Sequence, residues 1–295
     1  MPNWKAVLSE INSTEQPIDQ VRRKYLKKLQ KITGRNIIAY YSGWLTRPNI
    51  YGIQINDFDK DGFMNAVHAL DRSLGLDLIL HTPGGDAAAT ESIVDYLKRM
   101  FGNDIRAIIP QIAMSAGTMI ACSCKSIVMG KQSNIGPIDP QINGIPAMGV
   151  IEEFDRACDQ VKKNPATLPI WQTIISKYNP TFIGQCEKAI IWSKNMVKEW
   201  LISNMLQHNE NPEKKADAIV DRLTKQNKNH NHARHIHIDD CIDMGLKVEI
   251  LEDAKDNLQD AVLTVHHAYM HTISHGISFK IIENHKGVGM FLNAT

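Results

Sequence analysis

"LDLILHTPGGD" (residues 76–86) joins a short apolar run to a pair of glycines. A run of this length and composition is typical of a strand that is buried on both faces of a parallel sheet. The two glycines allow the chain to turn sharply and leave backbone N–H groups unshielded by a side chain. We therefore expect a strand over residues 76–81, exposed backbone at its carboxyl end, and a helix after it.

Further apolar runs follow the same pattern along the first half of the chain. "IRAIIP" (105–110) and "SIVMG" (126–130) are predicted strands, and a helical pattern separates each from the strand before it. Strands that alternate with helices indicate parallel βαβ units in an α/β domain. Beyond residue 146 the patterns are mainly helical, which predicts a helical C-terminal elaboration ending in a helix and a weak strand (276–283).

The composition limits the classes of partner and of compartment. The chain has 295 residues, a formal net charge of +1 and 43% hydrophobic residues, so it can bury a large core and has no excess charge for nucleic acid. Its five cysteines form no CxxC pair, which favours a reducing compartment. No leader and no apolar stretch long enough to span a membrane is visible, and we expect a cytoplasmic protein.

A serine within a run of small residues is the candidate nucleophile. Ser115 lies in "AMSAGTM" (113–119), at the expected start of a helix, where the helix dipole favours developing negative charge. An isolated serine in this place is more often a helix N-cap. The glycines Gly84 and Gly85, one βα unit upstream, change this balance, because their N–H groups are suited to hold an oxyanion. The alternative for the glycines is a tight βα turn.

These segments resemble a known family. "LDLILHTPGGDAAATESIVDYLKR" (76–99) and "AIIPQIAMSAGTMIACSCKSIVMGKQSNIGPIDPQ" (107–141) are similar to the ClpP-class serine proteases, above all to the signal peptide peptidase branch and the serine dehydrogenase proteinases. The resemblance implies a Clp/crotonase-like spiral of ββα units, peptide-bond hydrolysis through an acyl-serine intermediate, and a homo-oligomer. It suggests an N-terminal helical segment (1–34), a protease domain (35–251) and a C-terminal tail (252–295).

The resemblance also implies roles for single residues. Ser115 matches the nucleophile, and the amides around Gly84 or Gly85 and of Ala116 match the oxyanion hole. "SNIGPID" (133–139) matches the loop that lines the substrate groove, and its central residues are Ile135, Gly136 and Pro137.

The general base is less well defined. No histidine lies between His81 and His208, which argues against a histidine base of the Clp type. A lysine base must be neutral and therefore needs a dry pocket that lowers its pKa. Lys177, in "WQTIISKYNPTFIG" (171–184), resembles the base of the signal peptide peptidase branch. The alternatives are Lys188, the doublet Lys162 and Lys163, and the histidines His232 and His235.

Two segments resemble metal-binding patterns without completing them. The histidine spacing in "HNHARHIHIDD" (230–240) matches neither HExxH nor a zinc finger. "DFDKDG" (57–62) opens like an EF-hand, but His68 occupies the position of the bidentate glutamate, and the acidic residues fit better as a cap of the next helix. We expect no metal and no cofactor.

The sequence therefore predicts a cytoplasmic serine peptidase with a Ser–Lys dyad and a peptide or protein substrate. Two alternatives stay open. One is a crotonase-type acyl-CoA enzyme, which uses a similar oxyanion hole. The other is a non-catalytic assembly protein that retains the fold.

Overall fold

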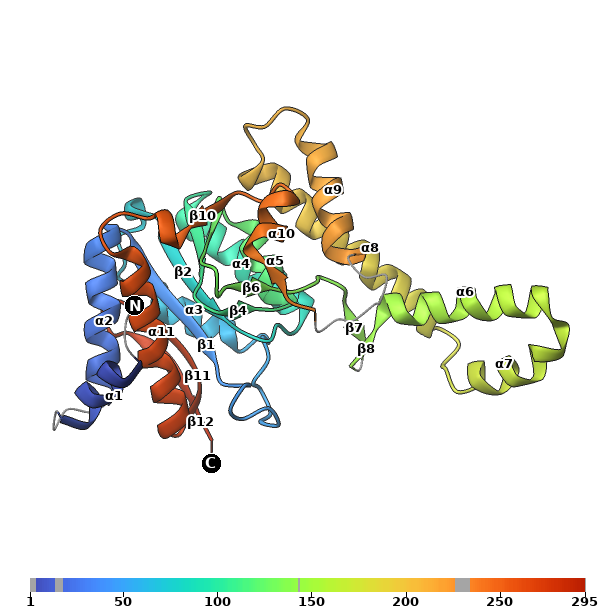
Figure 1. Ribbon diagram of the computed structural model, residues 1–295, viewed down its shortest axis with the longest axis horizontal. Helices are drawn as coiled ribbons and strands as arrows, with labels where there is room; N and C mark the ends of the chain where they lie inside the picture. Colours follow the sequence, from blue (N-terminus) through green and yellow to red (C-terminus); the bar gives the residue numbers. More distant parts are fainter. Residues whose placement is uncertain (1–3, 14–17, 143, 226–233, 295) are drawn as a thin grey trace.

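The computed structural model describes residues 4–13, 18–142, 144–225 and 234–294, and a seven-stranded sheet forms its centre (Figure 1). Five neighbouring strands run parallel, and two further strands add to them in antiparallel fashion. The predicted α/β fold with a mostly parallel sheet is confirmed. In order across the sheet, the strands are β10 (Val248–Ile250), β5 (Ser126–Met129), β3 (Ile105–Ile109), β2 (Leu76–His81), β1 (Asn36–Ser42), β11 (Ser278–Asn284) and β12 (Gly289–Asn293).

Helices cover both faces of the sheet, because successive side chains of a strand point to opposite sides. On one face, Ile38 and Tyr40 of β1 share a core with side chains of three helices, α3 (Asp59–Val67), α4 (Ala87–Phe101) and α5 (Ala116–Ser123). On the other face, Ile37 and Tyr41 share a second core with α2 (Ile18–Thr33) and α11 (Leu258–His275). The short helix α1 (Trp4–Ser13) packs on α11. Two 3-10 turns, η1 (Arg72–Leu74) and η4 (Leu251–Asp253), complete this part.

A small second sheet lies next to the carboxyl ends of the central strands. Its members are β4 (Ile112–Ala113), which follows β3, β6 (Asn134–Ile135), which follows β5, and β9 (Ile236–His237). β4 and β6 are parallel, and β9 is antiparallel to β6. The helix α10 (Ile238–Asp243) begins directly after β9. Because α5 starts shortly after β4 ends, this sheet fixes the start of α5.

An arm of helices projects away from the two sheets (Figure 1). A hairpin of β7 (Gln141–Ile142) and β8 (Ile145–Pro146) leads into α6 (Ala147–Lys163), the turn η2 (Pro165–Thr167), α7 (Leu168–Ile175) and α8 (Phe182–Trp200). The arm has its own small apolar cluster, in which Tyr178 contacts the rings of Phe154 and Phe182. α8 continues into a π-helical turn, η3 (Leu201–Met205), and packs against α9 (Pro212–Lys225). None of the described helices is long and apolar enough to cross a bilayer.

The C-terminal segment is part of the central sheet. β11 pairs with β1 over five residue pairs, and β12 closes that edge of the sheet. At the other end of the chain, α2 packs closely on α11. The division of the chain at residues 34 and 251 stays a prediction, and side chains pack extensively across both positions.

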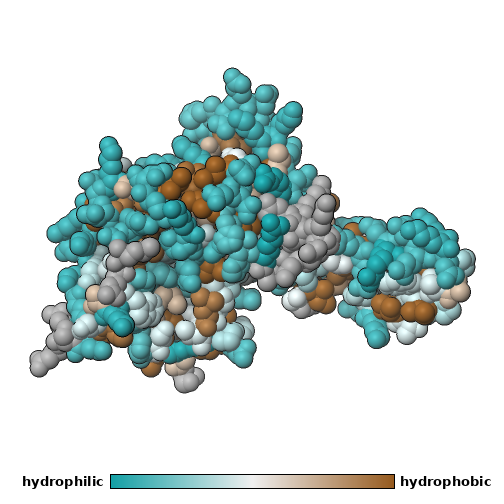
Figure 2. Space-filling view, viewed as in Figure 1, coloured by the Kyte–Doolittle hydropathy of each residue, from teal (hydrophilic) through white to brown (hydrophobic). Residues whose placement is uncertain are grey.

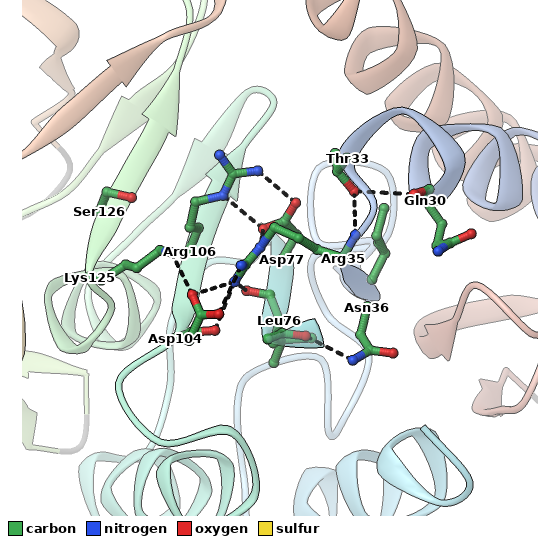
Figure 3. Close-up of polar contacts among 12 residues, drawn as sticks. Gln30, Thr33, Arg35, Asn36, Leu76, Asp77, Asp104, Arg106, Lys125 and Ser126 are labelled. Carbon is green, nitrogen blue, oxygen red and sulfur yellow. Dashed lines mark hydrogen bonds and ion pairs between the residues drawn. The ribbon is translucent and has the colours of Figure 1, made fainter. Parts of the chain in front are cut away.

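Ion pairs join the amino ends of the parallel strands (Figure 3). Asp77 of β2 is fully buried and accepts hydrogen bonds from Arg106 Nη2 (2.8 Å) and Arg35 Nε (2.7 Å). Arg35 also binds Asp104 through Nη1 (3.0 Å), and Arg106 binds Glu249 through Nη1 (2.7 Å). These five residues lie in β1, β2, β3 and β10 or in the turns that precede these strands.

Buried histidines lie between α11 and the sheet. His266 of α11 shares a hydrogen bond of 3.2 Å with the Tyr41 hydroxyl, and its ring packs edge-on against His81 of β2. Burial lowers the pKa of His266 to about 3, and it lowers the pKa of His81 well below the ordinary value. Both imidazoles are therefore neutral in the folded protein at neutral pH.

These histidines should make stability depend on pH. The unfolded imidazoles take up protons below pH ~6.5 and the folded ones do not, so stability is complete above that pH and falls on acidification. The slope of the free energy of unfolding against pH should therefore be smaller in the His266→Phe variant, by up to about 1.4 kcal/mol per pH unit. Urea unfolding of both proteins at pH 7, 6 and 5 measures it, and equal slopes would contradict the assignment.

Candidate active site

The turn after β2 and the turn before α5 are joined by backbone hydrogen bonds. Thr82 forms a parallel bridge with Ala113, in which the Thr82 amide donates to Ile112 (3.3 Å) and the Met114 amide donates to Thr82 (2.9 Å). This bridge places the TPGG turn beside the peptide that precedes Ser115. The two segments that the sequence analysis singled out are therefore neighbours in the fold.

Gly84 makes the closest contact between the two turns. A Cβ atom on Gly84 would lie 2.7 Å from Met114 O, 2.7 Å from Ser115 Cβ and 3.0 Å from Ala116 N. Its φ of +96° is also a conformation that L side chains rarely adopt. Only glycine fits here, for both reasons.

The peptide between Gly84 and Gly85 has a fixed orientation. Ile55 donates its amide to Gly84 O (2.8 Å) and accepts from the Asp86 amide (2.9 Å), which forms a one-residue parallel bridge with Gly85. Because a trans peptide directs its C=O and N–H to opposite sides, the Gly85 N–H points away from Ile55. It has no acceptor among the described residues. The Gly84 N–H, in contrast, donates to Thr82 Oγ1 (3.1 Å).

Ser115 has a strained backbone, with φ +50° and ψ −113°. Such a conformation costs on the order of 1–3 kcal/mol in a residue other than glycine, and strain of this kind is found at reactive sites. The Ser115 side chain makes no capping hydrogen bond to α5, so the structure does not support the interpretation as an N-cap. A serine on a sharp strand-to-helix turn with an uncommitted hydroxyl has the geometry of a nucleophile elbow.

A second amide lies beside Ser115. Ala116 is the first residue of α5, so its N–H has no acceptor within the helix. It lies on the same side of the turn as Gly84, as the 3.0 Å contact shows. Gly85 and Ala116 therefore supply two uncommitted N–H groups next to the serine.

Ser115 opens into a cleft of about 1250 Å³. Residues 48–58 line the cleft over their whole length, and Pro83, Gly85, Asp86 and Ala87 line it together with Ser115. The remaining described lining side chains come from α5, the loop after β6, β7, α8 and the C-terminal hairpin: Met119, Ile138, Pro140, Gln141, Ala189, Phe279 and Leu292. Polar and apolar groups both contribute to the lining, and the cleft is larger than a typical small-molecule pocket.

The predicted groove residues are buried next to the turn that carries Ser115 and do not line the cleft. Ile135, Gly136 and Pro137 are buried, and none of them lines the cleft, whose wall begins at Ile138. Gly136 packs on Met114, and its amide donates to Thr118 Oγ1 (3.0 Å). Ile135 pairs with Ala113, so these contacts hold the segment that precedes Ser115. Contact of the three residues with substrate stays a prediction.

The candidate lysine bases lie outside the cleft of the same chain. Lys177 is exposed in the turn between α7 and α8, within the arm. Lys188 is exposed on α8, one residue before Ala189, which does line the cleft. Lys162 and Lys163 end α6. No lysine among the residues that the structure describes lines the cleft.

The histidine candidates are placed differently from each other. His235 is exposed and precedes β9, which is two strands away from the strand that leads to Ser115. Neighbouring strands lie about 4.8 Å apart, so the His235 backbone is roughly 10 Å from that strand. His232 lies outside the described residues. Within the described ranges, no group of three or more histidine, cysteine or carboxylate side chains is arranged to hold a metal ion.

Two parts of the cleft carry no signal in the sequence. Ile55 fixes the Gly84–Gly85 peptide from a loop without periodic pattern, and its backbone, not its side chain, makes the contact. Phe279 and Leu292 reach the cleft because β11 and β12 join the sheet next to β1. Neither contact can be read from local residue patterns.

Comparison with known proteins gives a family and partial relatives. The profile of the family described as "ClpP-like SDH-type serine proteinase" matches residues 8–256. Two curated proteins of Methanocaldococcus jannaschii, "Uncharacterized protein MJ1495" and "Uncharacterized protein MJ0137", are each 34% identical, over 146 and 120 residues. The alignments cover 48% and 38% of this chain and 49% and 42% of the relatives. The chain thus spans about half the length of the curated relatives it matches, or less.

Solved structures with a similar course of the chain include two of a "1510-N membrane-bound stomatin-specific protease". Both have a TM-score of 0.40 and 18% identity, and both cover 69% of this chain. One is a serine-to-alanine mutant, 76% of which is covered. The other is a lysine-to-alanine mutant in complex with a substrate peptide, 72% of which is covered.

The close approach of Gly84 makes a prediction for the reactivity of Ser115. In the Gly84→Ala variant the new methyl group must push the two turns apart, and we expect labelling of Ser115 by a fluorophosphonate to slow at least tenfold. Gly102→Ala is the matched control, because Gly102 also has a positive φ (+61°) but no atom within 4 Å of the place that a methyl group would take. It should lose about 1–2 kcal/mol of stability and keep the labelling rate. Equal labelling rates in the two variants would contradict the role of Gly84.

Proposed function

The chain belongs to the ClpP-like SDH-type serine proteinase family, and from this premise we propose that it hydrolyses peptide bonds through an acyl-serine intermediate. The observation that supports this most directly is Ser115 itself: its backbone is strained, its side chain makes no capping hydrogen bond to α5, and the nearby Gly85 and Ala116 amides have no acceptor among the described residues. The family match also confirms that the α/β fold is of the ClpP-like type. A peptide would lie extended in the cleft with its scissile carbonyl over the Ser115 hydroxyl.

The proposed reaction uses the two amides at the stage where charge develops. Ser115 Oγ attacks the carbonyl carbon, and the carbonyl oxygen becomes an oxyanion held by the N–H groups of Gly85 and Ala116. Removal of one such donor typically costs on the order of 10²–10³ in kcat. The amino end of α5 adds a favourable dipole at the same place. Collapse of the tetrahedral intermediate releases the amine and leaves the acyl group on the serine, which water then removes.

A neutral lysine would serve as the base. It takes the proton from the Ser115 hydroxyl and later gives it to the leaving amine. We assign this role to Lys177 delivered by the arm of a second copy, because in its own chain Lys177 is exposed and does not line the cleft. To act as a base, the Lys177 amine would have to lose part of its hydration on entering the cleft. Lys188 and His235 are the alternatives.

Exposed apolar side chains on the arm support contact with a second copy. Leu168 and Ile170 of α7 are 44% and 62% exposed, and Ile191 and Trp192 of α8 are 58% and 41% exposed. Figure 2 shows apolar surface on the arm next to polar surface. Apolar surface gathered on a projecting element is typical of an interaction site. We therefore propose that the protein acts as a homo-oligomer.

The proposed location is the cytoplasm. All five cysteines are free thiols, and only Cys158 is exposed. Free thiols without any disulfide are usual in a reducing compartment.

Ser115 is tested directly by replacement with alanine. We expect Ser115→Ala to abolish hydrolysis of a casein-derived or other unstructured protein substrate and labelling by a fluorophosphonate, with the unfolding midpoint unchanged or slightly raised, since backbone strain at residue 115 is not increased. Turnover of an acyl-CoA thioester with no labelling of Ser115 would favour the crotonase-type reaction instead. Hydrolysis that survives the replacement would exclude Ser115 as nucleophile.

Delivery of the base from a second copy is tested by complementation. Ser115→Ala and Lys177→Ala should each be inactive alone. When they are mixed under conditions that exchange subunits, the intact Lys177 of one copy can serve the intact Ser115 of the other, and activity should return to roughly a quarter to a half of the wild-type value. The pair Ser115→Ala and Lys188→Ala is the control. Recovery only in the control mixture would assign the base to Lys188.

A further inference from the structure

A buried ion pair lies beneath the cleft loop. Lys280 of β11 and Asp59, the first residue of α3, are both fully buried, and Lys280 Nζ lies 2.8 and 3.0 Å from the two carboxylate oxygens of Asp59. The Tyr40 hydroxyl donates a third hydrogen bond to Asp59 (2.8 Å). A buried ion pair is a weak source of net stability, because both charges lose their hydration. We therefore ask which segments the pair holds in place rather than how much stability it adds.

The same pair holds the backbone of the cleft loop on both sides of Ile55. Lys280 Nζ donates to Gln54 O (2.7 Å), and the Asn56 amide donates to Asp59 Oδ2 (3.1 Å). One residue earlier, Ser42 Oγ donates to Ile53 O (2.6 Å). The ammonium thus makes hydrogen bonds to the carboxylate and to the loop carbonyl. Its three N–H groups are committed, so it is not available as a base.

We propose that Lys280 is a positioning residue for the oxyanion hole, acting through Asp59, Gln54 and Ile55. The Ile55 amide donates to the Gly84 carbonyl and so turns the Gly85 N–H away from the loop, to the side where we place the oxyanion. If the loop slips, the Gly84–Gly85 peptide is free to rotate and its N–H no longer points at the developing oxyanion. The inference rests on the proposed function, since it assigns a role within that reaction.

The inference makes the C-terminal hairpin part of the active site. β11 and β12 lie beyond residue 256, where the family match ends, yet they supply Lys280 to the loop and Phe279 and Leu292 to the cleft lining. Hydrolysis should accordingly depend on a segment that the family resemblance does not cover.

The test compares Lys280→Met with a matched variant near the amino ends of the parallel strands. Arg106→Met also removes a mostly buried cation from a carboxylate, but at the amino ends of the strands (Figure 3). In Lys280→Met we expect kcat for a peptide substrate to fall about 10–100-fold with KM within about twofold, because the Gly85 N–H acts mainly on the transition state. Affinity for a peptide boronate, which forms a tetrahedral adduct, should fall in parallel. Arg106→Met should lose stability and keep kcat within about twofold.

A double variant separates positioning from stability. Lys280→Met leaves the Asp59 carboxylate buried without its cation, and Asp59→Asn in the same chain removes that charge. The double variant should recover much of the lost unfolding midpoint while kcat stays low, because Gln54 O still lacks its donor. Recovery of kcat together with the midpoint would overturn the proposal, and so would an equal loss of kcat in Arg106→Met.

Hydrogen exchange gives a readout that does not depend on hydrolysis. In the Lys280→Met variant the amides of Ile55 and Asp86 should exchange faster than in the wild type, and they should be unchanged in Arg106→Met. Unchanged protection of these two amides in Lys280→Met would refute the anchoring itself. If the anchoring holds but the wild type shows no Ser115-dependent hydrolysis, the proposed function fails, and the role assigned to Lys280 fails with it.

Discussion

The close approach of Gly84 to the peptide that carries Ser115 is the constraint on which the site depends. No side chain fits between the two turns, and the left-handed φ of Gly84 is needed for the approach. The contact brings Gly84 close to Ala116 N, and neither the Gly85 amide nor the Ala116 amide has an acceptor among the described residues. A hydroxyl on a strained turn with two such donors is a preorganised arrangement, which costs no rearrangement at the moment of reaction.

Long-range packing holds this arrangement in place. The bridge between Thr82 and Ala113 joins the turns, and Ile55 orients the Gly84–Gly85 peptide from the opposite side. The loop with Ile55 is held in turn by the pair of Lys280 and Asp59. The strand β11 is thereby connected to the site through Gln54 and Ile55. The ion pairs of Asp77 lie at the amino ends of the parallel strands and share no residue with these contacts.

Local sequence patterns were sufficient for three strands in the parallel part of the sheet and for the turn that carries Ser115. The apolar runs predicted β2, β3 and β5, and small residues around Ser115 with the upstream glycines marked the turns that the structure brings together. Ile55 and Lys280 could not be found in this way, because both act through backbone or buried polar contacts between segments far apart in sequence. The base is a harder case, since Lys177 is on an arm and does not line the cleft of its own chain. The assignment of that lysine stays a prediction.

The central claim is that the Gly85 and Ala116 amides point at the oxygen that becomes charged when Ser115 is acylated. A crystal structure of the protein after reaction with a peptidyl phosphonate tests it most directly, because the phosphonyl oxygen takes the place of the oxyanion. The account predicts a bond from phosphorus to Ser115 Oγ, with the phosphonyl oxygen about 2.7–3.1 Å from both amide nitrogens. A phosphonyl oxygen directed to solvent, or a bond to another residue, would contradict it.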